Sequence, residues 1–188
     1  MTGTVARRAS RLPLVLVALV CLAPMVASYV AYYLFPRDSR TNYGALLATA
    51  PAPAITGTTV DGQPFALAGH RGQWVMLSAA GGRCDARCER ALYATRQARA
   101  IQGRERDRVA RVWLVTDGTA PAAALVAEHT DLAVVRTAPA VLATWPRGGD
   151  AIYLIDPLGN EVLAWPVNPD IKALAKDLTK LLRASQIG

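Results

Sequence analysis

The stretch WVMLSAAGGRCDARCERALYATRQARAI, from Trp74 to Ile101, decides the fold. Its first residues, WVMLS, are typical of a short buried strand. Two glycines break that strand, and from residue 86 to 101 the apolar and small side chains recur at the spacing of an amphipathic helix. Between strand and helix lie Cys84 and Cys88. The stretch therefore predicts a strand–loop–helix unit with a cysteine pair at the start of the helix.

The chain downstream repeats this alternation of strands and helices. From hydrophobic periodicity and turn residues we expect strands at 74–78, 109–116, 132–135, 151–155 and 161–165, and helices at 86–101, 121–129 and 170–184. Strands that alternate with helices imply right-handed crossovers and a parallel sheet, and the hairpin around the turn DPLGN adds antiparallel strands. This order resembles an α/β thioredoxin-like domain, with a central mixed sheet flanked by helices.

A turn and a linker are expected before this unit. Asp61-Gly62 is a turn signal between two short extended segments, roughly 55–60 and 63–67. The residues before them are rich in Ala, Pro and Thr, which is typical of a connecting segment. We therefore expect a linker at 36–54 and the thioredoxin-like domain at 55–188.

The N-terminal part has the features of a membrane anchor. No charged residue occurs from Leu12 to Phe35, and a helix needs about 20 apolar residues to cross a hydrocarbon core. Three arginines precede this run without an acidic residue, which orients the N-terminus toward the cytoplasm. We expect a cytoplasmic N-terminus at 1–11 and a transmembrane helix at 12–35. In a bacterium the protein is then a single-pass protein of the cytoplasmic (inner) membrane, with its C-terminal domain in the periplasm.

The alternative to an anchor is a cleaved signal peptide. The apolar region of a signal peptide normally has about 7–15 residues and is followed by small residues at the cleavage site. Here the run is longer, and its outer end, SYVAYYLFPR, is bulky. Both interpretations export the rest of the chain.

Positive charge is concentrated in one part of the exported domain. Nine arginines lie between Arg83 and Arg111, although residues 41–188 as a whole carry 16 basic and 13 acidic side chains. No aromatic interleaving or recognised module accompanies the arginines, so we expect no nucleic-acid partner. The simplest interpretation is a solvated helix face, and the alternative is a surface that docks on an acidic partner or on anionic lipid.

The two cysteines of the exported domain carry its chemistry. Cys84 and Cys88 are four residues apart, so at the start of a helix they share one face, and the helix N-terminus favours the thiolate. Two close thiols in an oxidising compartment can form a disulfide or hold a soft ion such as Cu(I). The alternative is a plain structural disulfide, although so short a loop adds little stability through chain entropy. Cys21 lies in the expected membrane span.

Four features carry a resemblance to a known family: the N-terminal anchor, LSAAGGRCDARC, VWLVTDGTAP and IYLIDPLGN. Over about residues 50–184 the sequence resembles the Sco/SenC family, thioredoxin-fold copper proteins that assist assembly of the copper site in cytochrome c oxidase. The resemblance implies that Cys84 and Cys88 are both the catalytic thiols and the metal ligands. It also implies Cu(I) as the cofactor, and as partners the membrane and a respiratory oxidase subunit or its assembly factors.

The sequence departs from the family pattern at the copper ligands. Asp85 and Glu89 follow the cysteines where the family commonly has proline. The family's third ligand is a histidine a few residues before the IYLID-like strand, but here that place reads RGGD, ending at Asp150. The two histidines, His70 and His129, do not match the motif, and we expect both to be exposed, in a loop or at a helix end. Two thiolates alone suit Cu(I) rather than Cu(II).

Three functions are compatible with this pattern. The first is a membrane-anchored assembly factor for cytochrome c oxidase that acts by thiol–disulfide exchange or Cu(I) delivery at the C-x3-C pair. The second is a membrane-tethered thiol–disulfide oxidoreductase, or a peroxide-responsive protein, unrelated to copper. The third is a non-enzymatic oxidase accessory protein with a permanent disulfide. No Ser/His/Asp arrangement, phosphate loop or paired carboxylates support a hydrolase or a nucleotide-binding enzyme.

Overall fold

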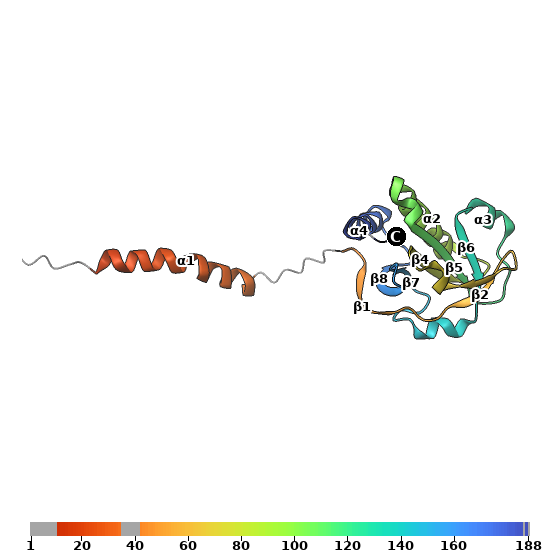
Figure 1. Ribbon diagram of the computed structural model, residues 1–188, viewed down its shortest axis with the longest axis horizontal. Coiled ribbons are helices and arrows are strands. Elements are labelled where there is room, and N and C mark those ends of the chain that lie inside the picture. Colours follow the sequence, from red (N-terminus) through yellow and green to blue (C-terminus); the bar gives the residue numbers. More distant parts are fainter. Residues whose placement is uncertain (1–10, 35–41, 186, 188) are drawn as a thin grey trace, which may run out of the picture. The chain divides into compact units, whose positions relative to one another are not determined.

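The computed structural model describes residues 11–34, 42–185 and 187 of the 188-residue chain, and its contacts divide the chain into two units. The first unit holds one described helix, α1, Leu12–Leu34 (Figure 1). Its segment Leu12–Ala31 is long and apolar enough to cross a membrane, and it lies where the anchor is expected. The expected cytoplasmic tail falls almost entirely outside the described residues.

The second unit, Asn42–Gly188, is built on an eight-stranded sheet with the order β1-β8-β7-β4-β5-β6-β2-β3. The strands are β1 Ala45–Pro51, β2 Thr56–Thr59, β3 Pro64–Ala66, β4 Trp74–Ala80, β5 Val109–Val115, β6 Leu132–Arg136, β7 Ala151–Ile155 and β8 Asn160–Pro166. The neighbours β4, β5 and β6 are parallel, whereas β7 runs antiparallel to β4 and forms a hairpin with β8. The expected mixed sheet of a thioredoxin-like domain is therefore confirmed.

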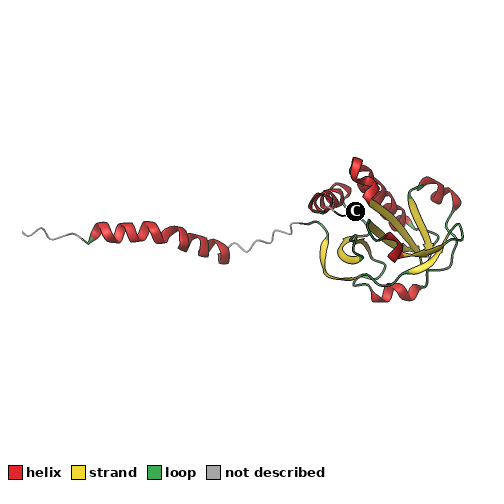
Figure 2. Ribbon diagram, viewed as in Figure 1, coloured by secondary structure: helices red, strands yellow, loops and turns green. Residues whose placement is uncertain are grey.

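Helices cover both faces of this sheet. They are α2 Ala86–Ile101, α3 Ala123–Glu128 and α4 Ile171–Ala184, with the short 3-10 helices η1 Leu67–His70, η2 Gly103–Arg108 and η3 Pro139–Thr144. The three α-helices lie on one face and η3 lies on the other (Figures 1 and 2). The bounds of α2 are those expected from the sequence, and η2 and η3 lie outside the expected helices and strands.

The core lies in two layers, one on each side of the sheet. Side chains of a strand alternate between its faces. On β4, Val75 and Leu77 pack in the layer beside η3, while Trp74 and Met76 pack in the layer beneath α2 and α4. The cysteine pair belongs to the helical side, because α2 begins there.

The segment before β2 is only partly a linker. Residues 45–51 lie within the expected linker at 36–54, but they form β1, which pairs antiparallel with β8. The Gly44 backbone N–H donates a hydrogen bond to the buried Asp177 carboxylate of α4 at 2.8 Å, and a Cβ at residue 44 would overlap the Leu163 side chain. The linker expectation was wrong for these residues because β1 is an edge strand with mostly exposed side chains and lacks a clear apolar alternation.

A buried arginine joins α2 to the sheet. Arg111 of β5 is 1% exposed and donates hydrogen bonds to the Leu92 carbonyl at 2.6 Å and to the Thr95 hydroxyl at 3.1 Å. Its guanidinium also pairs with Asp131, in the turn before β6, at 2.7 Å. Burial lowers the pKa of Arg111 to about 10, although the attraction of Asp131 opposes this shift. This arginine therefore belongs to the core and not to a solvated helix face.

Other arginines of the same stretch pair with carboxylates of their own domain. Among the described side chains these are Arg87, Arg96, Arg99, Arg106 and Arg108. Internal ion pairs thus balance much of the local positive charge, and no acidic partner is required to explain it.

Candidate functional site

The two cysteines at the start of α2 form the disulfide Cys84–Cys88, with a Cα–Cα distance of 5.1 Å. Asp85 caps the helix, because its side chain accepts a hydrogen bond from the Cys88 backbone N–H at 2.9 Å. Cys84 precedes the cap and has a φ of 43°, in the left-handed region that residues other than glycine seldom adopt. The acidic residue after Cys84 therefore serves as the helix cap.

A carboxylate from the next strand holds the loop that carries Cys84. Asp117, just after β5, accepts hydrogen bonds from the backbone N–H groups of Gly82 at 2.9 Å and Thr119 at 3.0 Å. These hydrogen bonds favour the ionised carboxylate and lower the pKa of Asp117. A Cβ at residue 82 would overlap the Thr119 carbonyl, so the close approach requires glycine. The loop is therefore fixed by contacts that do not involve sulfur.

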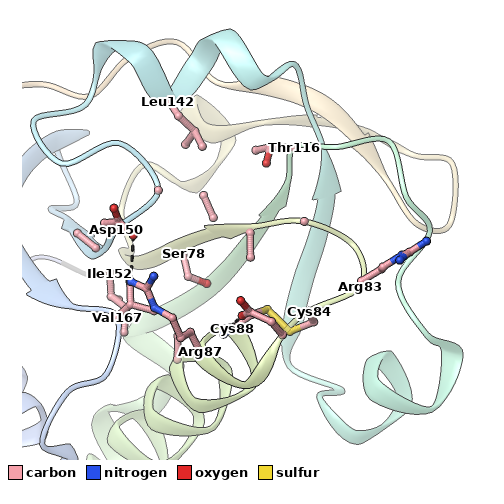
Figure 3. A pocket seen from close by; sticks show the side chains of 17 residues that line it. Ser78, Arg83, Cys84, Arg87, Cys88, Thr116, Leu142, Asp150, Ile152 and Val167 are labelled. Atoms are coloured by element: carbon pink, nitrogen blue, oxygen red, sulfur yellow. Dashed lines mark hydrogen bonds and ion pairs between the residues drawn. A yellow bond between two sulfur atoms is a disulfide. The ribbon is translucent and has the colours of Figure 1, made fainter.

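The disulfide lies between an apolar cluster and a pocket. Cys84 and Cys88 are each 5% exposed. One side of the pair packs against buried side chains of α2, β5 and β6, namely Leu92, Trp113, Val115 and Val134. The other side lines a pocket of about 410 Å³ (Figure 3). This pocket is the open side from which a reaction partner can approach the sulfur atoms.

The pocket forms where β4 and β7 separate. The ladder between these strands ends at the pair Leu77–Tyr153, whereas β4 continues to Ala80 and β7 begins at Ala151. Small and apolar side chains of both strands line the resulting space, together with Leu142 of η3. The apolar wall therefore comes from the sheet, and the sulfur atoms come from α2.

Polar groups face the pocket from three sides. Arg87 of α2 lies 3.0 Å from the Asp150 carboxylate in the loop before β7, so this ion pair spans the pocket (Figure 3). Ser78 of β4 is 7% exposed, and its hydroxyl points into the pocket without a hydrogen-bond partner among the described residues. Thr116 follows β5 and lines the same space, whereas the Arg83 side chain points away from the disulfide.

The donor atoms at this site restrict the metals that it fits. It offers two cysteine sulfurs, and the described part of the chain has no group of three His, Cys, Asp or Glu side chains that could hold an ion. The Asp150 carboxylate across the pocket is paired with Arg87. The residues therefore fit Cu(I) bound by two thiolates in the reduced protein, but they do not fit a three-ligand site that includes nitrogen.

Neither histidine belongs to the site. His129 lies at the end of α3, as expected, but it is 3% exposed and its Nδ1 has no hydrogen-bond partner among the described groups. The expected exposure of His129 was wrong because the residue is enclosed where the chain turns toward β6. Burial, with the charges of Arg111 and Arg96, lowers its pKa. His70 ends η1, is half-buried and has its Nδ1 3.4 Å from Gln73 Oε1, so its expected exposure was also wrong.

Sequence reasoning located both cysteines but missed the groups that surround them. A signal existed for Asp117, because it directly follows a strand parallel to β4, and the carboxyl ends of parallel strands meet at the same edge of a sheet. No sequence signal joins Arg87 to Asp150, which are 63 residues apart. The unpartnered hydroxyl of Ser78 likewise depends on where β7 leaves β4.

Residues 74–185 match the family model described as transmembrane-like, thioredoxin-like, C-terminal domain. The match covers more than half of the chain. The chain belongs to this family. The matched region of this transmembrane-like, thioredoxin-like family runs from β4 to the end of α4, and it includes the cysteine pair and the pocket. No curated protein matches the sequence.

Solved structures with the same fold include Sco proteins. The copper-bound ScoI of Arabidopsis thaliana is 18% identical, with a TM-score of 0.60 over 72% of this chain and 100% of that chain. The copper-bound ScoI of Bradyrhizobium japonicum is 17% identical, with a TM-score of 0.57 over 70% of this chain and 99% of that chain. The thioredoxin domain of a thiol–disulfide oxidoreductase from Bacteroides vulgatus is 19% identical, with a TM-score of 0.53 over 72% of this chain and 99% of that chain. These similarities confirm the expected thioredoxin-like fold.

Proposed function

We propose that this chain is a membrane-anchored, Sco-like assembly factor for cytochrome c oxidase that acts by thiol–disulfide exchange at Cys84 and Cys88. One observation carries the proposal: the two cysteines form a disulfide beside a pocket, at the start of α2, in the fold that this chain shares with Sco proteins. In this proposal α1 anchors the protein in the cytoplasmic membrane, and the thioredoxin-like domain works in the periplasm. Its partner is a respiratory oxidase subunit or an assembly factor of that subunit.

The exchange transfers one disulfide between two proteins. In the reduced protein, one thiolate of the pair attacks a client disulfide, which gives a mixed disulfide and a client thiolate that takes up a proton. The second cysteine then attacks the mixed disulfide, so the client leaves as a dithiol and the Cys84–Cys88 bond forms. The N-terminus of α2 favours the thiolate. A Cα–Cα distance of 5.1 Å lets the second sulfur reach the first without movement of the helix.

Cu(I) delivery at the same cysteines is the second candidate. The ScoI structures from Arabidopsis thaliana and Bradyrhizobium japonicum contain copper, and two thiolates are ligands that Cu(I) accepts. In this candidate the cargo is Cu(I) held by sulfur alone, because the Asp150 carboxylate across the pocket is paired with Arg87. A thiol–disulfide oxidoreductase unrelated to copper is the third candidate, and the Bacteroides vulgatus domain has the corresponding fold.

A trapping experiment tests the exchange. The full chain in detergent, reduced beforehand, is mixed with the copper-binding domain of an oxidase subunit whose cysteines are oxidised. We expect the wild-type protein to convert the client to its dithiol, and one of the variants Cys84→Ser and Cys88→Ser to accumulate a mixed disulfide detectable by mass spectrometry. Cys21→Ser is the matched control and should behave as wild type. A client that stays oxidised beside the reduced wild-type protein would contradict the proposal.

The double variant separates a redox role from a structural one. We expect Cys84→Ser/Cys88→Ser to fold, with a loss of about 2 kcal/mol in the free energy of unfolding, because the disulfide closes a short loop. The hydrogen bonds that Asp85 and Asp117 accept remain in that variant. Circular dichroism and thermal denaturation measure the change. An unfolded double variant would favour the permanent structural disulfide instead.

A titration with Cu(I) distinguishes the first two candidates. The reduced full chain competes with a Cu(I) chelator of known affinity. One tightly bound Cu(I) that is lost in Cys84→Ser would support Cu(I) delivery. If the protein binds no Cu(I) but still reduces its client, thiol–disulfide exchange is the only one of the two functions that remains.

A further inference from the structure

The pocket beside the disulfide contains polar groups that exchange between two sulfur atoms does not use. We propose that it binds a low-molecular-weight thiol that carries a carboxylate, and that this thiol reduces the Cys84–Cys88 disulfide between clients. The inference rests on the proposed function, because a protein that reduces its clients must itself be reduced again. It adds a binding site and names the chemical class of the reductant.

The size and shape of the pocket favour a small molecule over a polypeptide. Its volume of about 410 Å³ lies toward the lower end of the range of about 300–1,000 Å³ that is typical of small-molecule sites. The ion pair between Arg87 and Asp150 spans the pocket from α2 to the loop before β7 (Figure 3). A polypeptide that passes through the pocket would have to break this pair without replacing the charge of Asp150, whereas a small thiol with a carboxylate replaces that charge.

Ser78 supplies an unused hydrogen-bonding group inside the pocket. The residue is 7% exposed, its hydroxyl points toward the space beside Arg87 and Cys88, and no described group hydrogen-bonds to it (Figure 3). Its oxygen is not one of the buried polar atoms without a partner, so it is open to the pocket and available to a ligand. The Thr116 side chain lines the same space from the end of β5. An amide or carbonyl group of a ligand would complete the hydrogen bonding of these hydroxyls.

Arg87 is suited to bind the carboxylate. Its side chain is 65% exposed and its partner Asp150 is 78% exposed. Exposed ion pairs contribute little to stability, so Arg87 can exchange Asp150 for a ligand carboxylate at small cost. The new contact is a charge-assisted hydrogen bond next to the disulfide. Ala80, Ala91 and Ile152 provide an apolar wall for the methylene group that carries the thiol.

The reaction balances with two molecules of the thiol. The first thiolate attacks one sulfur of the Cys84–Cys88 bond, forming a mixed disulfide and releasing the other cysteine as a thiolate. The second thiolate attacks the sulfur of the bound thiol, so the small-molecule disulfide leaves and both cysteines are free. Two small thiols are oxidised, one protein disulfide is reduced, and the two protons pass to the cysteine thiolates.

The kinetics of reduction test the site directly. The oxidised full chain in detergent micelles is mixed with glutathione, a tripeptide thiol with two carboxylates, or with 2-mercaptoethanol, which has none. Acid quenching followed by mass spectrometry gives the rate of loss of the disulfide. We expect the rate to saturate as the glutathione concentration rises, because binding precedes attack, and to rise linearly with 2-mercaptoethanol.

Two variants and one control identify the groups that bind. In Arg87→Gln the ratio of the glutathione rate constant to the 2-mercaptoethanol rate constant should fall about tenfold. Ser78→Ala should also lower this ratio. The control is Arg90→Gln, which lies on the same helix, is hydrogen-bonded to Asn168 and does not line the pocket. It should leave the ratio unchanged.

Three results would overturn the inference. The first is a reduction rate that rises linearly with glutathione concentration. The second is a ratio of rate constants that is the same in Arg87→Gln and wild type. The third is a disulfide that a dithiol protein reduces quickly and glutathione does not. The last result would assign the pocket to a polypeptide segment. Failure of the proposed function is distinguishable, because then glutathione reduces the disulfide with saturation while the reduced protein leaves the oxidised client untouched.

Discussion

Replacing either member of the buried Arg111–Asp131 pair should affect stability very differently. Arg111 lies under α2 and donates hydrogen bonds to Leu92 and Thr95 in addition to its ion pair with Asp131 at 2.7 Å. The variant Asp131→Asn leaves a buried guanidinium without its counter-charge. The variant Arg111→Met removes the buried charge and places a flexible apolar side chain beneath the helix.

The pKa of Arg111 sets the size of the effect. A fall from its ordinary value of 12.5 to about 10 means that the fold disfavours the charged form by about 3 kcal/mol, even with Asp131 present. Arg111→Met removes this cost and leaves none of the former partners of Arg111 unpaired. The Thr95 hydroxyl still donates to the Leu92 carbonyl, and Asp131 still pairs with Arg99. We therefore expect its free energy of unfolding to equal or exceed that of wild type by up to about 3 kcal/mol.

Asp131→Asn should lower the free energy of unfolding by about 3 kcal/mol, which corresponds to a fall in Tm of about 10 °C for a domain of this size. Urea denaturation of the full chain in detergent, followed by tryptophan fluorescence, measures both variants. Asp107→Asn is the control, because Asp107 is 79% exposed in its pair with Arg99 and should change stability by less than about 1 kcal/mol. If Arg111→Met loses as much stability as Asp131→Asn, the reasoning from the burial cost is refuted.

Three further predictions concern other buried or hydrogen-bonded groups. Because the folded pKa of His129 is lowered, the stability linked to its neutral form is lost as pH falls below about 6.5, and His129→Leu should flatten the Tm between pH 7.5 and 5. Parallel curves for variant and wild type would disprove this. Asp177→Ala leaves the Gly44 N–H and the Trp165 indole N–H without their acceptor and should cost about 2–4 kcal/mol, with faster hydrogen exchange in β1. Unchanged exchange there would show that β1 is held by β8 alone. The lowered pKa of Asp117 stabilises the fold above about pH 4, and this stability is lost as pH falls further, so Asp117→Asn should flatten the Tm curve between pH 5 and 2. A curve that keeps the wild-type slope would rule this out.

The helix α2 and most central strands of the sheet were predictable because each carries a local signal in the sequence. Helix α2 follows from the spacing of its apolar residues, and the β7–β8 hairpin follows from two apolar runs around DPLGN. The strand β1 was missed because an edge strand with exposed side chains has the composition of a linker. Strand β5 was recognised, but the burial of Arg111 in it was not, since only the fold brings Asp131 and Thr95 around the guanidinium.

The candidate site was predictable only at its sulfur atoms. The C-x3-C spacing at the start of a helix identifies Cys84 and Cys88 as a pair from nearest-neighbour geometry. The ion pair between Arg87 and Asp150 and the free hydroxyl of Ser78 depend on where two strands separate, and such a separation has no local pattern in the sequence. The sequence alone therefore gives the candidate cysteines but not the side chains that surround them.

The contacts of the Gly82 loop bear on the speed of exchange. The N–H groups of Gly82 and Cys88 donate to Asp117 and Asp85, and neither hydrogen bond depends on whether the sulfur atoms are joined. We therefore expect the oxidised and reduced proteins to share one backbone at this loop, so that opening the bond rotates the two cysteine side chains and leaves the loop in place. In the proposed exchange, the barrier would then be set by the chemistry at sulfur and by the approach of the attacking group.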